Sequence, residues 1–508
     1  MSLGMGQPVP AHHKCKHSLR LQQQRPSRCL INASRPVITR VAKLEPHDAV
    51  APSTASAVDA VVHDGRLPFL QTLLQFAKPN AYAQKVLAGH RYAWGKMGLA
   101  YEDALFVADP AAARSLLTAE WQNGIRTEWP PTFKALLGEQ SISILQDPQL
   151  HSKLRQVMGP TFSAEAVAGL MPGVQQTVAK HVGRWAQQDS FAAYPAARLL
   201  TFDVLVNQAL GLGMDDDELA HFAKVFKQWG DGFMPPGIDL PFTAFGKGMA
   251  ARREMTARVQ QSLRDPNLGE GVVQRLRDEF GADSQVASDN VIVLMFAGYD
   301  TTSSAITYML NQLALNPHVL EQMRQEQAAV QAQHGNQLTP AAVAAMPYTT
   351  AVVKETLRTA QVIGYVPRVA TQALKVPGGG PELQSGCPFI VALGAMAASD
   401  PAAAAAAAVS AAGQGSPDSQ AGTVQDFRPE RWLQPELAKS LALHQAPFGM
   451  GAHYCLGSQL AMAELTAVLA ELARSYSLTA DTDTDWPDFP IKRPANGLPC
   501  TLRRLATA

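Results

Sequence analysis

Cys455 is the residue in this chain with the clearest potential for chemistry. It lies in a glycine-rich loop, Phe448–Gly457, which reads FGMGAHYCLG and precedes a predicted helix. A cysteine just ahead of a helix faces the positive end of the helix dipole and unpaired amide N–H groups, and both favour the thiolate over the thiol. Gly449, Gly451 and Gly457 carry no Cβ, so the loop backbone can approach a flat ligand closely. A lone cysteine is more often a small buried core residue, so the interpretation as a ligand depends on the rest of the chain.

A second chemical candidate is the string AGYDTT at residues 297–302, in the middle of a long apolar helix. An Asp–Thr–Thr step places polar groups inside a core helix, which costs stability unless those groups are used or paired. Gly298 would let the helix open locally and leave room for a ligand, and Asp300 and Thr301 would then relay protons. The alternative is a distorted helix in which threonine hydroxyls bond to carbonyls four residues earlier.

Two further segments carry charges whose spacing favours a structural role. Glu355 and Arg358 are three residues apart and therefore share one face of a predicted helix. On a protein surface such a pair would mean little. Arg431 lies in the segment FRPERW at residues 427–432, upstream of the cysteine loop, and is predicted to reach back to Glu355. This contact would fix the segment that carries Cys455.

These residues need a mostly helical framework to bring them together. Ser288 is the predicted N-cap of the long helix, and Asn316-Pro317 is its stop signal. The patterns predict helices over 110–117, within 151–230, over 288–316, over 348–360 and from about 456, a loop at 234–241, and strands within 362–374 and 388–393. The fold class is therefore mainly α with minor β, in a single domain over residues 65–508. Residues 401–422 are predicted to be a low-complexity insertion, although the run Ala402–Ala408 could form a short helix.

Composition limits the class of protein. The chain has 508 residues, is 46% hydrophobic and 17% charged, and balances 43 basic against 43 acidic residues. No basic excess or Lys/Arg-rich run interleaved with aromatics is present, which argues against nucleic-acid binding. The five cysteines are scattered without a CxxC pair, so neither a zinc site nor a disulfide framework is expected. A reducing compartment fits this usage.

The first residues differ in composition from the rest of the chain. Residues 1–44 contain no Asp or Glu but eight Lys or Arg, together with several Ser and Gln. Such acid-poor leaders are typical of organellar transit peptides, so residues 1–50 are predicted to target an organelle, with the chloroplast favoured and the mitochondrion the alternative. A disordered basic tail is the other interpretation. No stretch of eighteen apolar residues occurs, so we expect no transmembrane anchor, although peripheral contact with a membrane remains open.

Taken together, the four segments resemble those of the cytochrome P450 superfamily. They are the cysteine loop, the acid–alcohol pair, the Glu-x-x-Arg motif and the Pro-Glu-Arg motif, and their order and spacing are more specific than any one of them. The resemblance covers roughly residues 67–505. It implies a helical prism with small sheets, with haem b between the long helix and the cysteine-loop helix. It also implies a monooxygenase in which Cys455 is the axial iron ligand and Asp300 and Thr301 serve oxygen activation.

The same resemblance implies contacts to the haem propionates. His151 and Arg155 lie where the family's propionate-binding helix would be, and Arg368 lies on the strand that usually supplies another contact. His453 stands two residues before the cysteine, where the family usually has arginine. Histidine can still bond a propionate, but its charge titrates near neutrality. We therefore expect haem retention to weaken at high pH relative to a His453→Arg variant, and equal haem loss from both proteins across pH would contradict this.

Local stretches resemble the branch of the family that contains retinoic-acid hydroxylases and their cyanobacterial relatives. The stretches include LPFTAFGK at residues 240–247 and the spacing of His151 and Arg155. That branch acts on isoprenoid-derived lipids, which implies an apolar substrate such as a retinoid, carotenoid, sterol or terpenoid. The predicted lining of the substrate pocket is Ala297, Gly298, Tyr299, Val362, Ile363, Val366 and the Gly232–Phe245 loop, for which lid packing is the alternative.

The expected partners are O2, the apolar substrate and a separate electron donor, because the sequence shows no flavin- or iron–sulfur-binding domain. The donor would be ferredoxin in a plastid or an adrenodoxin-like protein in a mitochondrion, and Lys153 is a candidate contact for such an acidic protein. Two other functions remain open. One is a haem-thiolate isomerase or dehydratase, which commonly lacks the threonine present here as Thr301. The other is a non-catalytic haem carrier or sensor, which would need Cys455 and Glu355 but not the acid–alcohol pair.

Overall fold

The computed structural model describes residues 78–97, 102–233, 237–398, 427–488 and 491–506. All of them belong to one compact unit, Pro46–Ala508. The predicted leader at residues 1–50 and the predicted alanine-rich insertion at 401–422 lie outside the described residues. Within the described ranges, none of the helices combines the length and the apolar character needed to cross a lipid bilayer.

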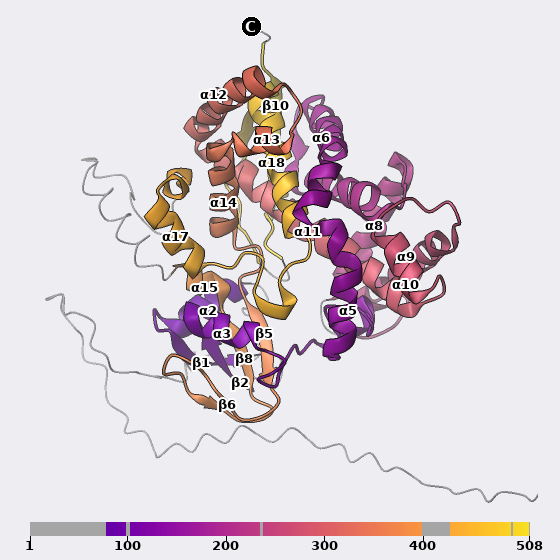
Figure 1. Cartoon of the computed structure of the whole chain (residues 1–508), viewed down its shortest axis with the longest axis vertical. Helices are drawn as coiled ribbons and strands as arrows, with labels where there is room; N and C mark the ends of the chain where they lie inside the picture. Colours follow the sequence, from indigo (N-terminus) through magenta and orange to yellow (C-terminus); the bar gives the residue numbers. More distant parts are fainter. Residues whose placement is uncertain (1–77, 98–101, 234–236, 399–426, 489–490, 507–508) are drawn as a thin grey trace, which may run out of the picture. The chain divides into compact units, whose positions relative to one another are not determined.

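The described part of the chain is mainly helical, as predicted (Figure 1). The α-helices are α2 (Pro79–Leu87), α3 (Pro110–Thr118), α4 (Pro131–Leu137), α5 (Pro148–Met158), α6 (Ala164–Ala186), α7 (Ala193–Asp203), α8 (Asp216–Asp231), α9 (Ala244–Arg264), α10 (Val272–Phe280), α11 (Gln285–Leu315), α12 (Pro317–His334), α13 (Pro340–Ala344), α14 (Pro347–Ala360), α15 (Leu393–Ala398), α17 (Pro435–His444) and α18 (Ser458–Ser475). Short helical turns are η1 (Gly159–Phe162), η3 (Pro429–Leu433) and η4 (Gly451–His453), and η2 (Val204–Leu210) is a π-helix.

The strands form small sheets. Five of them pair in the order β1-β2-β8-β5-β3, with β2 and β8 parallel and the other pairs antiparallel. Their bounds are β1 (Tyr92–Met97), β2 (Glu102–Val107), β3 (Ile125–Arg126), β5 (Val366–Ala370) and β8 (Pro388–Val391). The other strands are β4 (Phe191–Ala192), β9 (Tyr476–Ala480) and β10 (Pro499–Arg504) in one sheet, and β6 (Leu374–Lys375) with β7 (Glu382–Leu383) in another. In Figure 1 the five-stranded sheet lies together with α2 and α3.

The long helix α11 organises the helical part, because it packs against α7, α9, α14 and α18. Its C-terminal boundary at Asn316 agrees with the sequence, but the predicted N-cap is wrong. Ser284, four residues earlier than predicted, accepts a hydrogen bond from the Ala287 N–H and caps the helix. Ser288 already lies inside the helix, where its hydroxyl donates to the Ser284 carbonyl. Two serines four residues apart offer the same capping signal, and packing decides between them.

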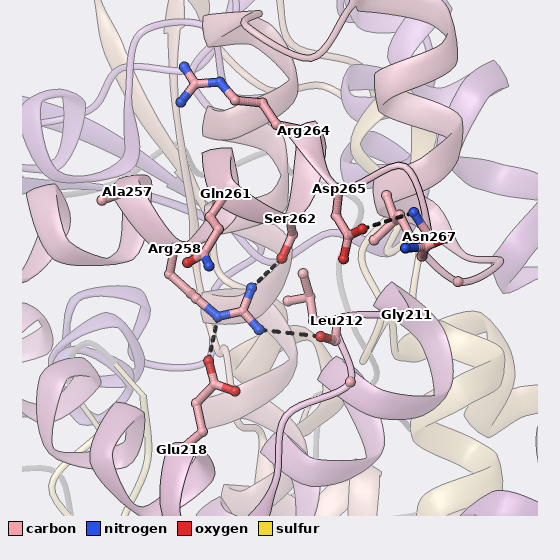
Figure 2. A pocket seen from close by; sticks show the side chains of 13 residues that line it. Gly211, Leu212, Glu218, Ala257, Arg258, Gln261, Ser262, Arg264, Asp265 and Asn267 are labelled. Atoms are coloured by element: carbon pink, nitrogen blue, oxygen red, sulfur yellow. Dashed lines mark hydrogen bonds and ion pairs between the residues drawn. The ribbon is translucent and has the colours of Figure 1, made fainter.

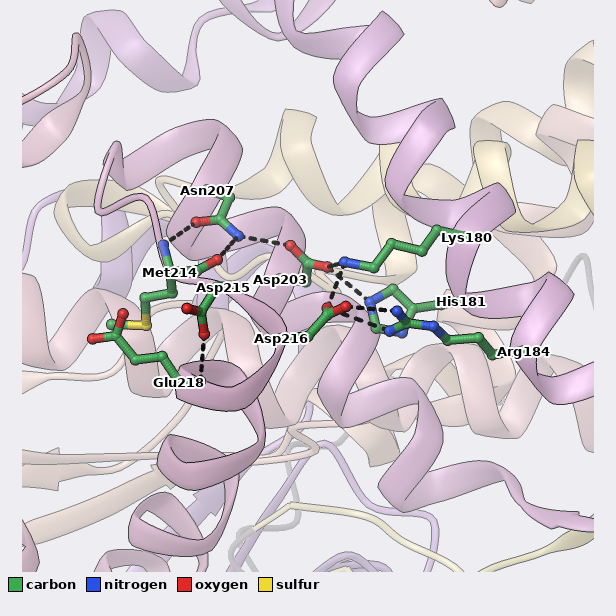
Figure 3. Close-up of polar contacts among 9 residues, drawn as sticks. All are labelled: Lys180, His181, Arg184, Asp203, Asn207, Met214, Asp215, Asp216 and Glu218. Carbon is green, nitrogen blue, oxygen red and sulfur yellow. Dashed lines mark hydrogen bonds and ion pairs between the residues drawn. The ribbon is translucent and has the colours of Figure 1, made fainter.

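A π-helical segment, η2, continues α7 and is held by a polar cluster around the buried Asp203 (Figure 3). Asp203 at the junction accepts hydrogen bonds from Lys180 at 2.8 Å and Asn207 at 2.8 Å, and lies 2.9 Å from His181 Nε2. Asn207 in turn accepts from the Met214 N–H at 2.7 Å. This cluster therefore fixes both ends of the turn between α7 and α8.

Candidate functional site

The cysteine loop is held by backbone contacts that its glycines make possible. The Cys455 N–H donates to the Phe448 carbonyl at 2.8 Å and closes the loop around η4. Gly451 has a φ of 68°, and a Cβ at this position would lie 1.8 Å from the Leu117 carbonyl oxygen, so the loop approaches the C-terminus of α3 too closely for any side chain. Gly449 also requires a positive φ, of 72°. Glycine is therefore needed at both positions for the loop itself.

The protonation of the Cys455 thiol is governed by the protein around it. Cys455 is exposed, yet burial by the surrounding protein raises the pKa of its thiol. The Gly457 N–H lowers the pKa, as the sequence predicted for an amide N–H at this helix start, and the charge of Arg155 lowers it too, but burial outweighs both. The predicted effect of the amide N–H groups is therefore present, but it is smaller than the effect of burial. Coordination to a metal ion would deprotonate the thiol outright.

Three of the predicted propionate contacts lie together near the loop. His151 of α5 is buried, and its ring centroid lies 4.6 Å from that of His453 in η4. Burial, together with the charges of His453 and Arg155, lowers the pKa of His151 to about 4, so this imidazole is neutral. Arg155 donates to the Tyr454 carbonyl at 2.8 Å and thereby braces the residue next to the cysteine.

Arg368 joins the same group through a residue that the sequence did not indicate. The buried carboxylate of Glu120 accepts hydrogen bonds from Arg368 on β5, and its other oxygen lies 2.7 Å from His453 Nδ1. Trp121, the next residue, packs its ring against both His151 and His453. A single glutamate in a turn after α3 has no sequence pattern that would mark it, because its partners are distant along the chain.

The predicted structural charges form one closed network. Arg358 donates to both oxygens of Glu355 at 2.8 Å, and Arg431 Nε lies 3.3 Å from Glu355 Oε1, as predicted. The sequence did not indicate two further donors, the Arg428 N–H at 2.9 Å and Trp432 Nε1 at 3.0 Å. Trp432 and Arg428 lie within the same FRPERW segment, so that segment wraps the Glu355 carboxylate.

The acid and the alcohol of α11 point to different partners. Thr301 Oγ1 donates to the Ala297 carbonyl at 2.6 Å, which is the back-bonded arrangement that the sequence left as the alternative. Asp300 forms an ion pair with Arg198 at 2.8 Å and accepts a hydrogen bond from the Tyr194 hydroxyl at 3.2 Å. Burial raises the pKa of Asp300 even though Arg198 and Tyr194 act to lower it. A carboxyl with a raised pKa can hold a proton nearer neutral pH than an ordinary aspartate.

The predicted substrate-pocket residues divide into two groups. Ala297 and Ile363 are exposed, although Ala297 lies in the middle of a core helix, and Val362 and Val366 are half-buried. Tyr299, in contrast, is buried beneath Arg198 at 4.3 Å and packs against Phe202 and Phe226, and its prediction as a lining residue is wrong.

Gly298 also has a different role from the one predicted. A Cβ there would lie 2.8 Å from Leu205 of η2, so the glycine serves the close packing of two helices. It does not open the helix, because α11 is continuous from Gln285 to Leu315.

A separate cavity of about 900 Å³ lies between η2, α8, α9 and the start of the α9–α10 connection (Figure 2). Arg258 at its centre is engaged by Glu218, by Ser262 and by the Leu212 carbonyl. Neither Cys455 nor the acid–alcohol pair lines this cavity, so it is distinct from the cysteine site.

The residues around Cys455 fit a haem. His453 Nε2 is buried and has no hydrogen-bond partner among the described residues, and a porphyrin carboxylate would satisfy it. A Cβ at Gly457 would meet no protein atom within 4 Å, so the backbone beside the sulfur borders open space, as expected for a flat ligand. An exposed cysteine beside backbone that borders open space, with cations and imidazoles grouped for carboxylates, fits a haem-thiolate site.

The comparisons with known proteins agree with this class. The family model described as cytochrome P450 matches residues 276–402 and 425–500, which include the Glu355 network and the cysteine loop. Over these residues the chain is similar to the cytochrome P450 family, a class of haem-thiolate monooxygenases with haem b as cofactor.

Similar proteins include members of two groups. The chain is 26% identical over 406 residues to cytochrome P450 26B1 of Mus musculus, covering 76% of this chain and 75% of the relative. It is 25% identical over 409 residues to abscisic acid 8'-hydroxylase 2 of Arabidopsis thaliana, covering 78% and 79%. Among solved structures, retinoic acid bound cyanobacterial CYP120A1 matches with a TM-score of 0.71 and 23% identity, over 85% of this chain and 96% of that chain. The last likeness supports the fold.

Proposed function

We propose that this cytochrome P450 oxygenates an apolar, isoprenoid-derived substrate with electrons from a separate donor protein. The observation that carries the chemistry is an exposed Cys455 in a loop whose backbone at Gly457 leaves space for a flat ligand. The names of similar proteins support the substrate class, because one binds retinoic acid and another hydroxylates abscisic acid.

When bound, a haem held by the Cys455 thiolate would supply the oxygen-activating chemistry, because the thiolate donates electron density. The protein supplies the protons and the surroundings. Asp300 holds a proton more readily than an ordinary aspartate, and Thr301 presents a hydroxyl one residue further along α11. The Asp300 carboxylate is ion-paired with Arg198, so it must leave that pair and take up a proton before it can pass one toward Thr301.

Exposed apolar side chains support an apolar substrate. Ile363 is 46% exposed, and Ala297 is exposed on the same helix face as Thr301, four residues away. The connection before α9 carries three further exposed apolar residues, Ile238, Leu240 and Phe242. These residues fit the role of an entrance for a lipid-like molecule.

The electron donor is proposed to be a small acidic protein such as a ferredoxin. Lys153, the contact predicted from the sequence, forms an ion pair with Glu279 at 2.7 Å, and both side chains are exposed. An acidic donor would compete with Glu279 for Lys153, so this lysine would contribute less than an unpaired cation. We also propose that residues 1–50 direct the protein to a chloroplast, which would supply ferredoxin. A fusion of residues 1–50 to a fluorescent protein tests this, and a cytosolic signal would contradict it.

The first experiment is the reduced carbon-monoxide difference spectrum of wild type beside Cys455→Ser. A red-shifted thiolate band that is lost in the variant is the expected result. The substrate class is then tested by titrating retinoids, carotenoids, sterols and terpenoid acids and following the haem absorption, with a linear fatty acid as control. Binding of the fatty acid alone would contradict the isoprenoid class.

Turnover separates the alternative functions. A monooxygenase requires reductant and O2, whereas an isomerase or dehydratase acts on peroxides without either. Replacement of Thr301 by Ala should lower product formation on the order of 10²-fold while haem is retained. An unchanged function in that variant would indicate a haem carrier or sensor.

A further inference from the structure

Glu120 is a buried carboxylate that none of the sequence motifs accounts for. It is 0% exposed and lies in the turn after α3, where its carbonyl accepts the Ile125 N–H at 2.8 Å and starts β3. Burying an unpaired carboxylate is costly, so its partners indicate its role.

The Glu120 carboxylate bridges two separate elements. Its Oε2 accepts from Arg368 Nη2 at 3.2 Å and from Arg368 Nε at 3.3 Å, and its Oε1 lies 2.7 Å from His453 Nδ1. Burial acts to raise the pKa of Glu120, but His453 and Arg368 together hold it below its ordinary value, so the group is ionised. The glutamate therefore ties strand β5 to the cysteine loop.

Both partners keep donors that Glu120 does not use. Arg368 has five N–H donors, of which two are directed to Glu120 and one to the Pro367 carbonyl, so others remain. His453 Nδ1 lies 2.7 Å from Glu120 Oε1 in an ion pair without well-aligned hydrogen-bond geometry, whereas the buried Nε2 has neither an ion-pair nor a hydrogen-bond partner among the described residues. The rings of His151 and Trp121 pack against His453 and restrict its plane. A buried polar atom left unsatisfied costs about 1–3 kcal/mol, so Nε2 indicates a ligand oxygen.

We propose that Glu120 is a positioning residue of the haem site, which bridges Arg368 and His453 so that both present their remaining nitrogens to one porphyrin carboxylate. A histidine is shorter than the arginine usual at this position and has only two nitrogens. It therefore needs a partner on Nδ1 to direct Nε2 toward the ligand, and Glu120 is that partner. Glu120 does not touch the haem in this proposal and acts through the two residues that do.

The test combines two changes, singly and together: a substitution of Glu120 in the protein and a block of the carboxylates on the porphyrin. Wild type and Glu120→Gln are each loaded with haem or with haem dimethyl ester, whose carboxylates are blocked, and the rate of haem transfer to excess apomyoglobin is measured. Glu128→Gln is the matched control, because Glu128 is an exposed glutamate of the same region in a surface ion pair with Lys134.

With haem, we expect Glu120→Gln to release its cofactor on the order of tenfold faster than wild type, as is usual for the loss of a residue that orients a ligand-binding side chain. With the dimethyl ester the two proteins should differ by less than about twofold, because the coupled contact is absent in both. Glu128→Gln should match wild type with either porphyrin.

Two outcomes would overturn the proposal. An equal acceleration with haem and with its ester would show that Glu120 acts only on the fold. Slower release from the variant with haem would show that Glu120 competes with the porphyrin carboxylate. If Glu120→Gln does not fold, Glu120→Asp retains the charge with a shorter reach, and it should show a smaller acceleration that again requires free carboxylates.

The proposal rests on haem attachment through Cys455 and not on the substrate class. Haem-release rates are measured without substrate, so failure of the isoprenoid proposal would leave this result unaffected. Absence of a thiolate band in wild type would remove the premise of both.

Discussion

Two glutamates in this protein have zero exposure and an arginine partner, yet their surroundings differ. The Glu355 carboxylate accepts hydrogen bonds from Arg358, the Arg428 N–H and Trp432, with Arg431 within 3.3 Å. The Glu120 carboxylate has longer contacts to Arg368 and a contact to His453, whose other nitrogen has no partner among the described residues. Satisfied buried networks rigidify a fold, whereas an incomplete one indicates a missing ligand. The open Nε2 of His453 thus distinguishes the Glu120 carboxylate, which serves a site, from the structural Glu355 carboxylate.

The largest effect is expected from breaking the closed network. Glu355→Gln leaves the charge of Arg358 buried and uncompensated, and breaking such a pair costs about 3–5 kcal/mol. We expect loss of folded haem-containing protein, measured by the yield of holoprotein and by thermal unfolding. Glu321→Gln is the matched control, because Glu321 and Arg324 have the same three-residue spacing on the surface, with Glu321 exposed. An equal loss of stability in both variants would contradict the assignment.

A smaller effect is expected from a third buried carboxylate, Asp203, which is satisfied and lies in the polar cluster of Figure 3. Burial raises its pKa, but His181, Lys180 and Asn207 outweigh this and hold the pKa at about 2. A depressed pKa stabilises the folded state above the unfolded value of about 4, and this contribution is lost as pH falls toward about 2. Asp203→Asn should therefore lower the free energy of unfolding by about 2 kcal/mol at pH 7.

The difference between Asp203→Asn and wild type should shrink as pH falls from about 4. Chemical unfolding followed across this range measures it. Haem release should be unchanged, because this network has no role at the site. Faster haem release from Asp203→Asn would contradict the distinction between satisfied and incomplete networks.

The smallest effect is expected from His151, which contacts His453 but is neutral. Its pKa of about 4 leaves it uncharged from pH 5 to 8, so it adds no pH dependence to haem retention in that range. The haem-release profile of His151→Phe should therefore run parallel to that of wild type between pH 5 and 8. A profile that loses its slope in the variant would show that His151 titrates there.

The sequence predicted the Glu355 network better than the Glu120 network for a physical reason. Glu355 and Arg358 are local on one helix, and Arg431 belongs to a compact motif, so spacing alone indicates the contacts. Glu120 and Arg368 are separated by 248 residues and have no shared pattern. The same limit explains why the burial of Tyr299 was not predicted, because its packing against α7 and α8 depends on how the helices meet in the folded protein.

Local signals also decided which elements could be predicted. Asp109 caps α3 and precedes Pro110, and α3 has nearly the predicted bounds. Strands β1 and β2 were not predicted, because Gly95, Lys96, Glu102 and Asp103 interrupt their apolar pattern. Gly95 is explained only by the tertiary structure, where a Cβ would lie 2.8 Å from Val86.

The large sequence separation between Glu120 and its partners has a consequence for the biogenesis of the protein. Local contacts such as the one between Glu355 and Arg358 form early, whereas contacts that close long loops form late in folding. The bridge from Glu120 to Arg368 and His453 cannot exist until nearly the whole chain has been synthesised and has folded back on the turn after α3. We therefore expect the polypeptide to capture haem after its release from the ribosome, and cofactor supply at that moment would set the yield of active enzyme.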